Sequence, residues 1–215
     1  MRALPDIRGL KYPDEFIARH FFKRGLHQRA GKVVELGGGT GNNLSLYAAY
    51  GWILVNVDYS AAALEDARWN LGEAATLIQA DLSLGLPDGI EGPIDVLLIP
   101  NLLCYLTNAQ AHRVLTAVRE KLAPNAEVFV RTRLVDDYRY GRGVAEEPDG
   151  FRLATPETGE EGLFNLFYTE AGLVNRLRDE LGLAQPDIFR VSFDNLQAGV
   201  RVPRNSDLVV WGSAS

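Results

Sequence analysis

The fold is decided by residues 33–43, which read Val33-Val34-Glu35-Leu36-Gly37-Gly38-Gly39-Thr40-Gly41-Asn42-Asn43. The stretch begins as a short β-branched run of strand length and then breaks into glycines, which are typical of a tight turn. After the glycines, apolar residues recur at helical spacing until Gly51 ends the pattern. The stretch therefore predicts a strand, a glycine loop and a helix, with bare backbone in the loop that can approach a ligand closely.

The same alternation continues toward the C-terminus. Strands are predicted at 53–57, 77–80, 94–99 and 127–134, and helices at 60–71 and 108–122. Residues 94–99 are almost entirely apolar, which is typical of a central parallel strand buried on both faces. Strands that alternate with helices predict an α/β fold with a doubly wound, mostly parallel sheet.

Both ends of the chain and one internal segment add to this pattern. A helix is predicted at 14–28, and another at 169–181 is followed by apolar runs at 188–193 and 208–211. We place these two runs as an antiparallel hairpin at one edge of the sheet. Residues 136–162 are rich in Asp, Glu, Arg, Gly and Pro and show little periodicity, so they predict a lid, a binding loop or a disordered segment.

Length and composition limit the classes of function. A chain of 215 residues can bury one core, so residues 1–215 are expected to form a single domain. The net charge of −6 disfavours nucleic acid as a substrate, and the apolar runs are too short to enter a membrane. Cys104 is the only cysteine and the start of the sequence lacks a secretory signal, so we expect a cytoplasmic location. No metal site is predicted, and a homodimer stays open.

Two acidic residues follow the predicted strands at spacings that suit a nucleotide. Asp58 lies at the end of the second strand, twenty-one positions after Gly37, where a carboxylate can accept both hydroxyls of a ribose. Asp81 ends the third strand and can accept from an adenine amino group. The spacing of Asp58 alone fits NAD as well as S-adenosylmethionine (SAM).

The glycine register and Glu35 separate these two cofactors. In a dinucleotide site a third glycine normally comes three positions after the second, whereas Gly39 is followed by Thr40, Gly41 and Asn42. A carboxylate in the first strand suits a cofactor with a free amino group and a positive sulfonium better than a pyrophosphate. Both features favour SAM.

These segments resemble a known family. The runs VVELGGGTGNN, VNVDYS and QADL are similar to motif I, the ribose-binding acid and the adenine-binding acid of class I SAM-dependent methyltransferases, and they span residues 33–82. Within the family, Pro13-Asp14-Glu15-Phe16 and Tyr50-Gly51-Trp52 resemble poorly characterised bacterial members of the small-molecule type, which adds no substrate. The resemblance implies a Rossmann-like, seven-stranded sheet with helices on both faces and a C-terminal antiparallel hairpin. It also implies that Glu35 and the loop lie near the amino-acid end of SAM, Asp58 on ribose and Asp81 near adenine. The full set of expected cofactor contacts is Glu35, Gly37, Gly38, Gly39, Gly41, Asn42, Asp58, Tyr59, Asp81, Leu82 and Pro100.

The methyl acceptor is expected beyond the carboxyl end of the fourth strand, at residues 100–105. Asn101 and Tyr105 are the catalytic candidates there, and the ring of Tyr105 can face the sulfonium or pack under the next helix. His112, His20 and Tyr168 are candidate bases, although surface roles fit both histidines as well. Cys104 is more typical of a small buried hydrophobe than of a nucleophile.

Further candidates for acceptor binding follow in the chain. Arg131 and Arg133 alternate along the fifth strand and therefore share a face, where they could hold a carboxylate or phosphate or form ion pairs within the fold. Tyr138 and Tyr168 belong to the candidate substrate lid at 136–168, and residues 1–30 form a helical cap.

The sequence thus predicts methyl transfer from SAM to oxygen or nitrogen of a small molecule. Two alternatives stay open: a SAM-binding partner or sensor without catalysis, and an NAD-dependent oxidoreductase.

Overall fold

A seven-stranded sheet forms the centre of the chain, in the order β3-β2-β1-β4-β5-β10-β9. The computed structural model describes residues 4–154, 156, 159–197 and 199–215. The strands of this sheet are β1 (Lys32–Leu36), β2 (Ile53–Asp58), β3 (Ala75–Gln79), β4 (Ile94–Pro100), β5 (Leu122–Arg133), β9 (Asp187–Gln197) and β10 (Val200–Ser213). The first five are parallel, and β10 runs antiparallel to both β5 and β9. The expected Rossmann-like sheet with a C-terminal hairpin is confirmed.

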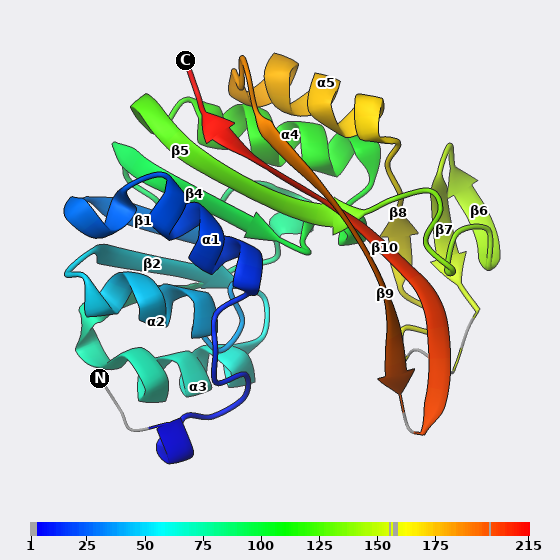
Figure 1. Cartoon of the computed structure of the whole chain (residues 1–215), viewed down its shortest axis with the longest axis horizontal. Coiled ribbons are helices and arrows are strands. Elements are labelled where there is room, and N and C mark those ends of the chain that lie inside the picture. The colour runs from blue at the N-terminus through cyan, green and yellow to red at the C-terminus, as the bar shows by residue number, and fades with distance from the viewer. Residues whose placement is uncertain (1–3, 155, 157–158, 198) are drawn as a thin grey trace.

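Helices cover both faces of this sheet (Figure 1). The helices are α1 (Glu15–Lys23), α2 (Asn42–Ala49), α3 (Ala61–Leu71), α4 (Asn108–Arg119) and α5 (Glu170–Leu181). One core cluster joins α1 and α2 to the sheet, and the other joins α4 and α5 to its opposite face. Adjacent residues of one strand supply both clusters, because successive side chains of a strand point to opposite faces: Val33 joins the first cluster and Val34 the second. None of the helices in the described part of the chain is long and apolar enough to span a membrane.

Two helix ends differ from the prediction. The helix expected at 14–28 is α1, which ends at Lys23, because Gly25 takes a left-handed conformation with φ of 67° and a short 3-10 helix, η2 (Leu26–Gln28), follows. The helix expected to run to 122 is α4, which ends at Arg119. Strand β5 already begins at Leu122, because Leu122 pairs with Ile94 of β4 before the register shifts. Apolar periodicity alone does not reveal where such a pairing begins.

The segment at 136–162 is more regular than expected. It contributes to a second, antiparallel sheet of three short strands, β6 (Gly143–Glu147), β7 (Gly150–Leu153) and β8 (Phe164–Leu166). Tyr140, Phe151 and Phe167 pack beside it with ring centroids 5.1–6.2 Å apart. The sequence does not predict β6, because the residues of this strand are almost all exposed and show no alternation of apolar and polar side chains.

The C-terminal hairpin is longer than the two apolar runs predict. Strands β9 and β10 continue through the segment expected to be a polar loop, with an irregularity between Val202 and Asn205. The hairpin extends beyond the ends of the parallel strands toward the small sheet (Figure 1).

Candidate functional site

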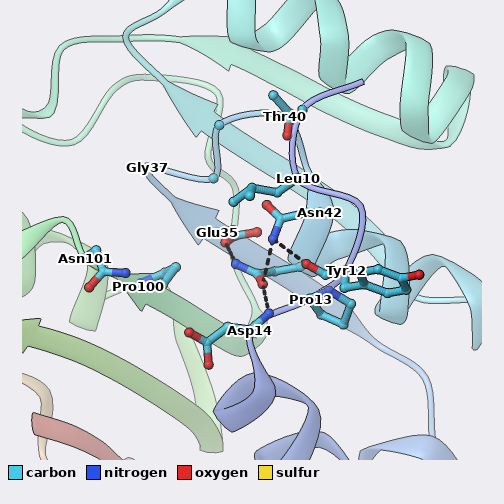
Figure 2. Close-up of a pocket in the computed structure, with 14 residues that line it drawn as sticks. Leu10, Tyr12, Pro13, Asp14, Glu35, Gly37, Thr40, Asn42, Pro100 and Asn101 are labelled. Carbon is cyan, nitrogen blue, oxygen red and sulfur yellow. Dashed lines mark hydrogen bonds between the residues drawn. The ribbon is translucent and has the colours of Figure 1, made fainter. Parts of the chain in front are cut away.

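A cavity of about 510 Å³ lies at the carboxyl ends of β1 and β4 (Figure 2). Its walls come from three parts of the chain: the end of β1 with the glycine loop and the start of α2, the end of β4, and an N-terminal strap, which we define as residues 9–14. The lining residues are Gly9, Leu10, Tyr12, Pro13, Asp14, Glu35, Gly37, Gly38, Gly39, Thr40, Asn42, Asn43, Pro100 and Asn101. The cavity therefore includes most of the predicted glycine loop together with the first residues of the predicted acceptor side.

The glycine loop needs glycine for two different reasons. Gly37, Gly39 and Gly41 have φ of 75°, 51° and 77°, a conformation that L side chains rarely adopt. Gly38 has no such angle, but an added Cβ would lie 2.1 Å from Oδ1 of Asn56. Around Gly39 an added Cβ would meet no atom within 4 Å, so the loop is open there. A ligand can therefore approach the Cα of Gly39 closely.

Glu35 is a fully buried carboxyl at the cavity wall. Its Oε1 accepts a hydrogen bond of 2.6 Å from Nδ2 of Asn43, while Oε2 is buried and has no partner among the described residues. Burial raises the pKa of Glu35 to about 8, and the hydrogen bond from Asn43 opposes this only in part. A buried acceptor without a donor fits a ligand that brings a cationic or N–H group to this wall. The residues present therefore fit the amino-acid end of SAM.

The strap was missing from the predicted contacts. Asn43 accepts the backbone N–H of Asp14 at 2.8 Å, and Asn42 donates to the carbonyl of Tyr12 at 3.0 Å, so the start of α2 holds the strap over the loop (Figure 2). The strap adds Leu10, Tyr12, Pro13 and Asp14 to the site. The one signal in the sequence is the Asn42-Asn43 pair after the glycines, whose partners are about thirty residues away along the chain.

Asp58 and Asp81 do not line this cavity. Asp58 accepts the backbone N–H groups of Gly39 and Ser60, both at 2.9 Å, so the fold itself engages both of its oxygens. Asp81 is exposed and accepts the N–H of Ser83 at the start of a 3-10 helix, η4 (Leu82–Leu84). Of the three carboxylates expected around the cofactor, only Glu35 lines this cavity, although the ends of β1, β2 and β3 lie side by side; the roles of Asp58 and Asp81 stay predictions.

The remaining expected cofactor contacts lie near the loop without lining the cavity. Gly41 precedes α2, and its φ of 77° leads the loop into the helix. Tyr59 is 76% exposed after β2, and Leu82 is buried. Contacts of these residues, and of Asp58 and Asp81, with a cofactor stay predictions.

On the acceptor side, Asn101 lines the cavity and Tyr105 does not. Asn101 has φ of 54° and donates its backbone N–H to the carbonyl of Arg131 at 2.8 Å. The hydroxyl of Tyr105 accepts a hydrogen bond of 3.1 Å from Arg133. The guanidinium of Arg133 also lies over the ring of Tyr105, 5.2 Å from the ring centre. Burial raises the pKa of Tyr105 to about 12, which keeps this hydroxyl protonated at neutral pH.

The candidate bases lie elsewhere. His112 is exposed, and its Nδ1 lies 3.1 Å from Oε1 of Glu180 between α4 and α5, so it lies outside the cavity and its catalytic role stays a prediction. His20 is not on the surface: it is fully buried, with Nε2 3.4 Å from Oε2 of Glu127, and burial lowers its pKa. Tyr168 is also buried and accepts a hydrogen bond from Arg176, and burial raises its pKa. None of these three side chains lines the cavity.

The two arginines of β5 form ion pairs within the fold, as one of the two interpretations expects. Arg131 pairs with Asp14 and Asp207, and Arg133 pairs with Glu160. Tyr138 is buried under the guanidinium of Arg139, with 4.4 Å between that group and the ring centre.

Cys104 is fully buried, and burial raises its pKa to about 11, so it is the small hydrophobe that the sequence indicates. Within the described residues, no group of three His, Cys, Asp or Glu side chains is placed to hold a metal ion.

Comparison with known proteins gives a consistent result. Residues 34–128, from β1 into β5, match a family model described as a methyltransferase domain. No curated protein sequence matches the chain. Among solved structures, a SAM-dependent methyltransferase from Methanosarcina mazei is similar with a TM-score of 0.65 and 17% identity, over 85% of this chain and 92% of that one.

Two further similar structures are complexes with a ligand. DhpI, solved with SAH, has a TM-score of 0.57 and 16% identity, over 93% of this chain and 85% of that one. The glycopeptide N-methyltransferase MtfA, solved with sinefungin, has a TM-score of 0.57 and 15% identity, over 93% of this chain and 86% of that one. At such identities the likeness shows a shared fold.

Proposed function

We propose that this chain is a class I SAM-dependent methyltransferase that transfers the methyl group of SAM to oxygen or nitrogen of a small-molecule acceptor; the methyltransferase family model matched by residues 34–128 and the shared fold support this. SAM is the methyl donor of this family, in agreement with the sequence. When bound, it supplies an electrophilic methyl group on a positively charged sulfur.

The observation that carries the proposal is that Oε2 of Glu35, on the wall of the glycine-loop cavity, has no hydrogen-bond partner in the part of the chain that the structure describes. A cofactor amino group beside this oxygen would complete its hydrogen bonding and stabilise the ionised carboxylate. The open space at Gly39 leaves room for the cofactor, and the strap forms another wall of the same cavity. Asp58 fixes the loop through the N–H of Gly39 and, in the proposal, offers its remaining lone pairs to the ribose.

The acceptor side needs no elaborate catalytic group. Methyl transfer from a sulfonium is an in-line displacement, so holding donor and acceptor in line can contribute on the order of 7–11 kcal/mol in favourable cases. Asn101 lines the cavity at the end of β4 and is placed to orient the acceptor. The small sheet, within the expected lid at 136–168, completes this side in the proposal, and the whole chain acts as one domain.

A cytoplasmic location is part of the proposal. Its support is that Cys104, the one cysteine of the sequence, is a buried free thiol.

Calorimetry with four ligands tests the cofactor assignment. We expect SAM and S-adenosylhomocysteine to bind and NAD and NADP not to bind. Asp58→Ala should weaken SAM binding by about 1–3 kcal/mol, because it leaves hydrogen-bonding groups unpaired. The exposed Asp88→Ala is the matched control and should bind SAM as the wild type does. Binding of NAD alone would contradict the proposal and favour the oxidoreductase alternative.

Methyl transfer tests the reaction itself. The protein is incubated with SAM labelled on the methyl group and a library of small hydroxyl and amine compounds, and labelled products are identified by mass spectrometry. Transfer to a member of the library supports the proposal, and Asn101→Ala should lower kcat/KM for that acceptor. Tight SAM binding without transfer to any compound would favour the sensor alternative.

A further inference from the structure

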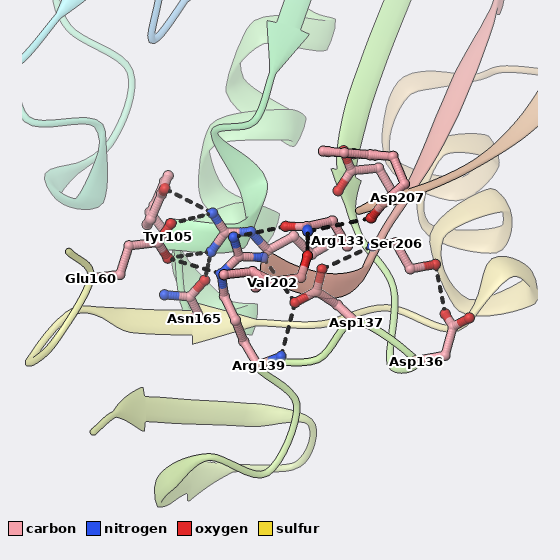
Figure 3. A network of polar contacts seen from close by, with 12 residues as sticks. Tyr105, Arg133, Asp136, Asp137, Arg139, Glu160, Asn165, Val202, Ser206 and Asp207 are labelled. Carbon is pink, nitrogen blue, oxygen red and sulfur yellow. Dashed lines mark hydrogen bonds and ion pairs between the residues drawn. The ribbon is translucent and has the colours of Figure 1, made fainter. Parts of the chain in front are cut away.

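Arg133 lies at the centre of a polar cluster beyond the end of β5 (Figure 3). Its guanidinium meets both oxygens of Glu160, with Nη1–Oε2 at 2.7 Å and Nη2–Oε1 at 2.8 Å. Two parallel hydrogen bonds of this kind are the geometry in which arginine recognises a carboxylate. The site is therefore shaped for a planar carboxylate.

Glu160 comes from an exposed turn between β7 and β8. The turn is closed by the N–H of Leu163, which donates to the carbonyl of Glu160 at 3.0 Å. Gly159 and Gly162 flank it with φ of 68° and 79°, and an added Cβ at either would meet no atom within 4 Å. The Glu160 side chain is 16% exposed, whereas its described neighbours Gly159, Glu161 and Gly162 are exposed. Movement of Glu160 away from Arg133 would therefore take no neighbouring side chain of the turn out of the core.

The cluster holds buried donors that Glu160 does not satisfy. Nε of Arg139 is buried and lies 3.8 Å from Oε2 of Glu160, which is beyond hydrogen-bond range. Asn165 is fully buried; its Oδ1 accepts from Arg133, but its Nδ2 has no partner among the described residues. Buried donors without partners are costly. A carboxylate that is not part of the turn can approach Nε of Arg139 and Nδ2 of Asn165 more closely than Glu160 does.

The charges of the cluster favour a single negative charge on the ligand. Arg133 and Arg139 are the two cations, and Asp137 already pairs with Arg139 at 2.9 Å. A carboxylate in place of Glu160 keeps the cluster balanced, whereas a phosphate dianion adds a charge. A carboxylate is therefore the better fit.

The cluster also lies on the acceptor side. Tyr105 accepts a hydrogen bond from Nη2 of Arg133 at 3.1 Å and belongs to the 3-10 helix η5 (Leu103–Tyr105), just after Asn101. Asn101 lines the cofactor cavity, and its backbone N–H donates to the carbonyl of Arg131, two residues before Arg133 on β5. Tyr105 is 38% exposed, so one side of the cluster reaches solvent.

We propose that Arg133, with Arg139, Asn165 and Tyr105, binds a carboxylate group of the methyl acceptor, and that Glu160 occupies this site until the acceptor displaces it. As a statement about the acceptor, the assignment rests on the proposed function. The anion site itself does not depend on SAM and is tested without it.

Thermal melts of four proteins test the site: the wild type, Glu160→Ala, Glu161→Ala and the double variant Glu160→Ala/Arg133→Gln. Each is melted in acetate, phosphate and chloride at equal pH and ionic strength. Glu160→Ala leaves the buried Arg133 without its carboxylate partner, so its Tm should fall by about 6–20 °C in chloride. Acetate should recover several degrees of this loss. Glu161 is an exposed carboxylate of the same turn, so Glu161→Ala is the matched control.

The wild type and Glu161→Ala should melt alike in acetate and chloride, and the double variant should lose the acetate effect. Equal melts of Glu160→Ala in acetate and chloride would overturn the site. An acetate effect that persists in the double variant would also overturn it, and a larger effect of phosphate than of acetate would overturn the carboxylate assignment. If Glu160→Ala does not fold, Glu160→Gln keeps the side-chain shape, and absence of an acetate-specific gain there would overturn the proposal.

Calorimetry of the wild type with SAM distinguishes the two proposals. An acetate effect in a protein that does not bind SAM would leave the anion site standing and remove the proposed function. Once an acceptor is found, Arg133→Gln should raise its KM more than it lowers kcat, and removing the carboxylate from the acceptor should have the same effect on the wild type.

Discussion

At the scale of single residues, the hydrogen-bond partners of two buried carboxyls give them different roles. Glu35 follows two valines in β1 and is completely enclosed, so its charged form is disfavoured. Asp58 lies at the end of the next strand and accepts two backbone N–H groups. The same chemical group thus has two roles. Oε2 of Glu35 has no donor among the described residues, whereas Asp58 fixes the glycine loop by accepting the N–H of Gly39.

Glu35 should make the stability of the free protein depend on pH. Its pKa is raised from 4.5 to about 8, so folding is favoured by neutral Glu35 below pH 4.5, and this contribution is lost as the pH rises through 8. The loss amounts to at most about 5 kcal/mol, at about 1.4 kcal/mol per pKa unit. Glu35→Gln cannot ionise, so its Tm should fall less between pH 5 and pH 9 than that of the wild type.

Thermal melts across this range measure the difference. The exposed Glu65→Gln is the control, and it should follow the wild type. Parallel curves for Glu35→Gln and the wild type would show that Glu35 ionises in the folded protein as easily as in the unfolded chain.

At the scale of elements, the glycine loop combines a backbone requirement with a packing requirement. Gly38→Ala would place a methyl group 2.1 Å from Oδ1 of Asn56, so Asn56 must move and its hydrogen bond to the carbonyl of Gly39 is strained. Such overpacking costs about 1–3 kcal/mol. Gly39→Ala costs about 1–2 kcal/mol for its left-handed backbone but meets no neighbouring atom.

The two variants should therefore differ in what they lose. Gly38→Ala should lower the free energy of unfolding more than Gly39→Ala, as measured in urea. Gly39→Ala should weaken SAM binding by calorimetry, because its methyl group enters the open side of the loop. Gly51→Ala, also at positive φ with open space around it but outside the site, controls for backbone strain. SAM binding equal in Gly39→Ala and Gly51→Ala would contradict the assignment of this loop.

At the scale of the whole molecule, Arg131 joins three segments that are far apart in the chain. Its Nη1 lies 2.6 Å from Oδ2 of Asp14 at the start of α1, and its Nη2 lies 2.6 Å from Oδ2 of Asp207 in β10. All three side chains are at most 15% exposed. The pair with Asp14 also fixes the end of the strap that covers the cavity.

Arg131→Met should be strongly destabilising. It leaves two nearly buried carboxylates without a counter-charge, which costs about 3–5 kcal/mol and lowers Tm by about 6–20 °C. The exposed Arg29→Met is the matched control, with little expected change. Adding Asp14→Asn and Asp207→Asn to Arg131→Met should recover part of the loss, and no recovery would argue against the ion pairs as its cause.

Much of this molecule follows from local patterns in the sequence. The apolar runs that mark the parallel strands, the helix starts at Ser60, Thr107 and Thr169, and the glycine loop are all patterns within a few residues of the sequence. These local patterns predict the order of strands and helices along the chain, and they place the glycine loop directly after the first strand of the sheet. The resemblance to the methyltransferase family follows from them, because the matching motif is itself a strand, a turn and a helix.

Only the tertiary structure decides which side chains meet at the site. The strap lies over the loop because Asn43 accepts the N–H of Asp14. Asp58 accepts the N–H of Gly39 in the loop, and Arg133 donates to Glu160 from the turn between β7 and β8. Each of these contacts joins residues 19 to 29 positions apart, so no periodicity or spacing in the sequence encodes it. The physical reason is that a polar group binds whichever partner folding brings within about 3 Å, and that choice is made only when the chain has packed.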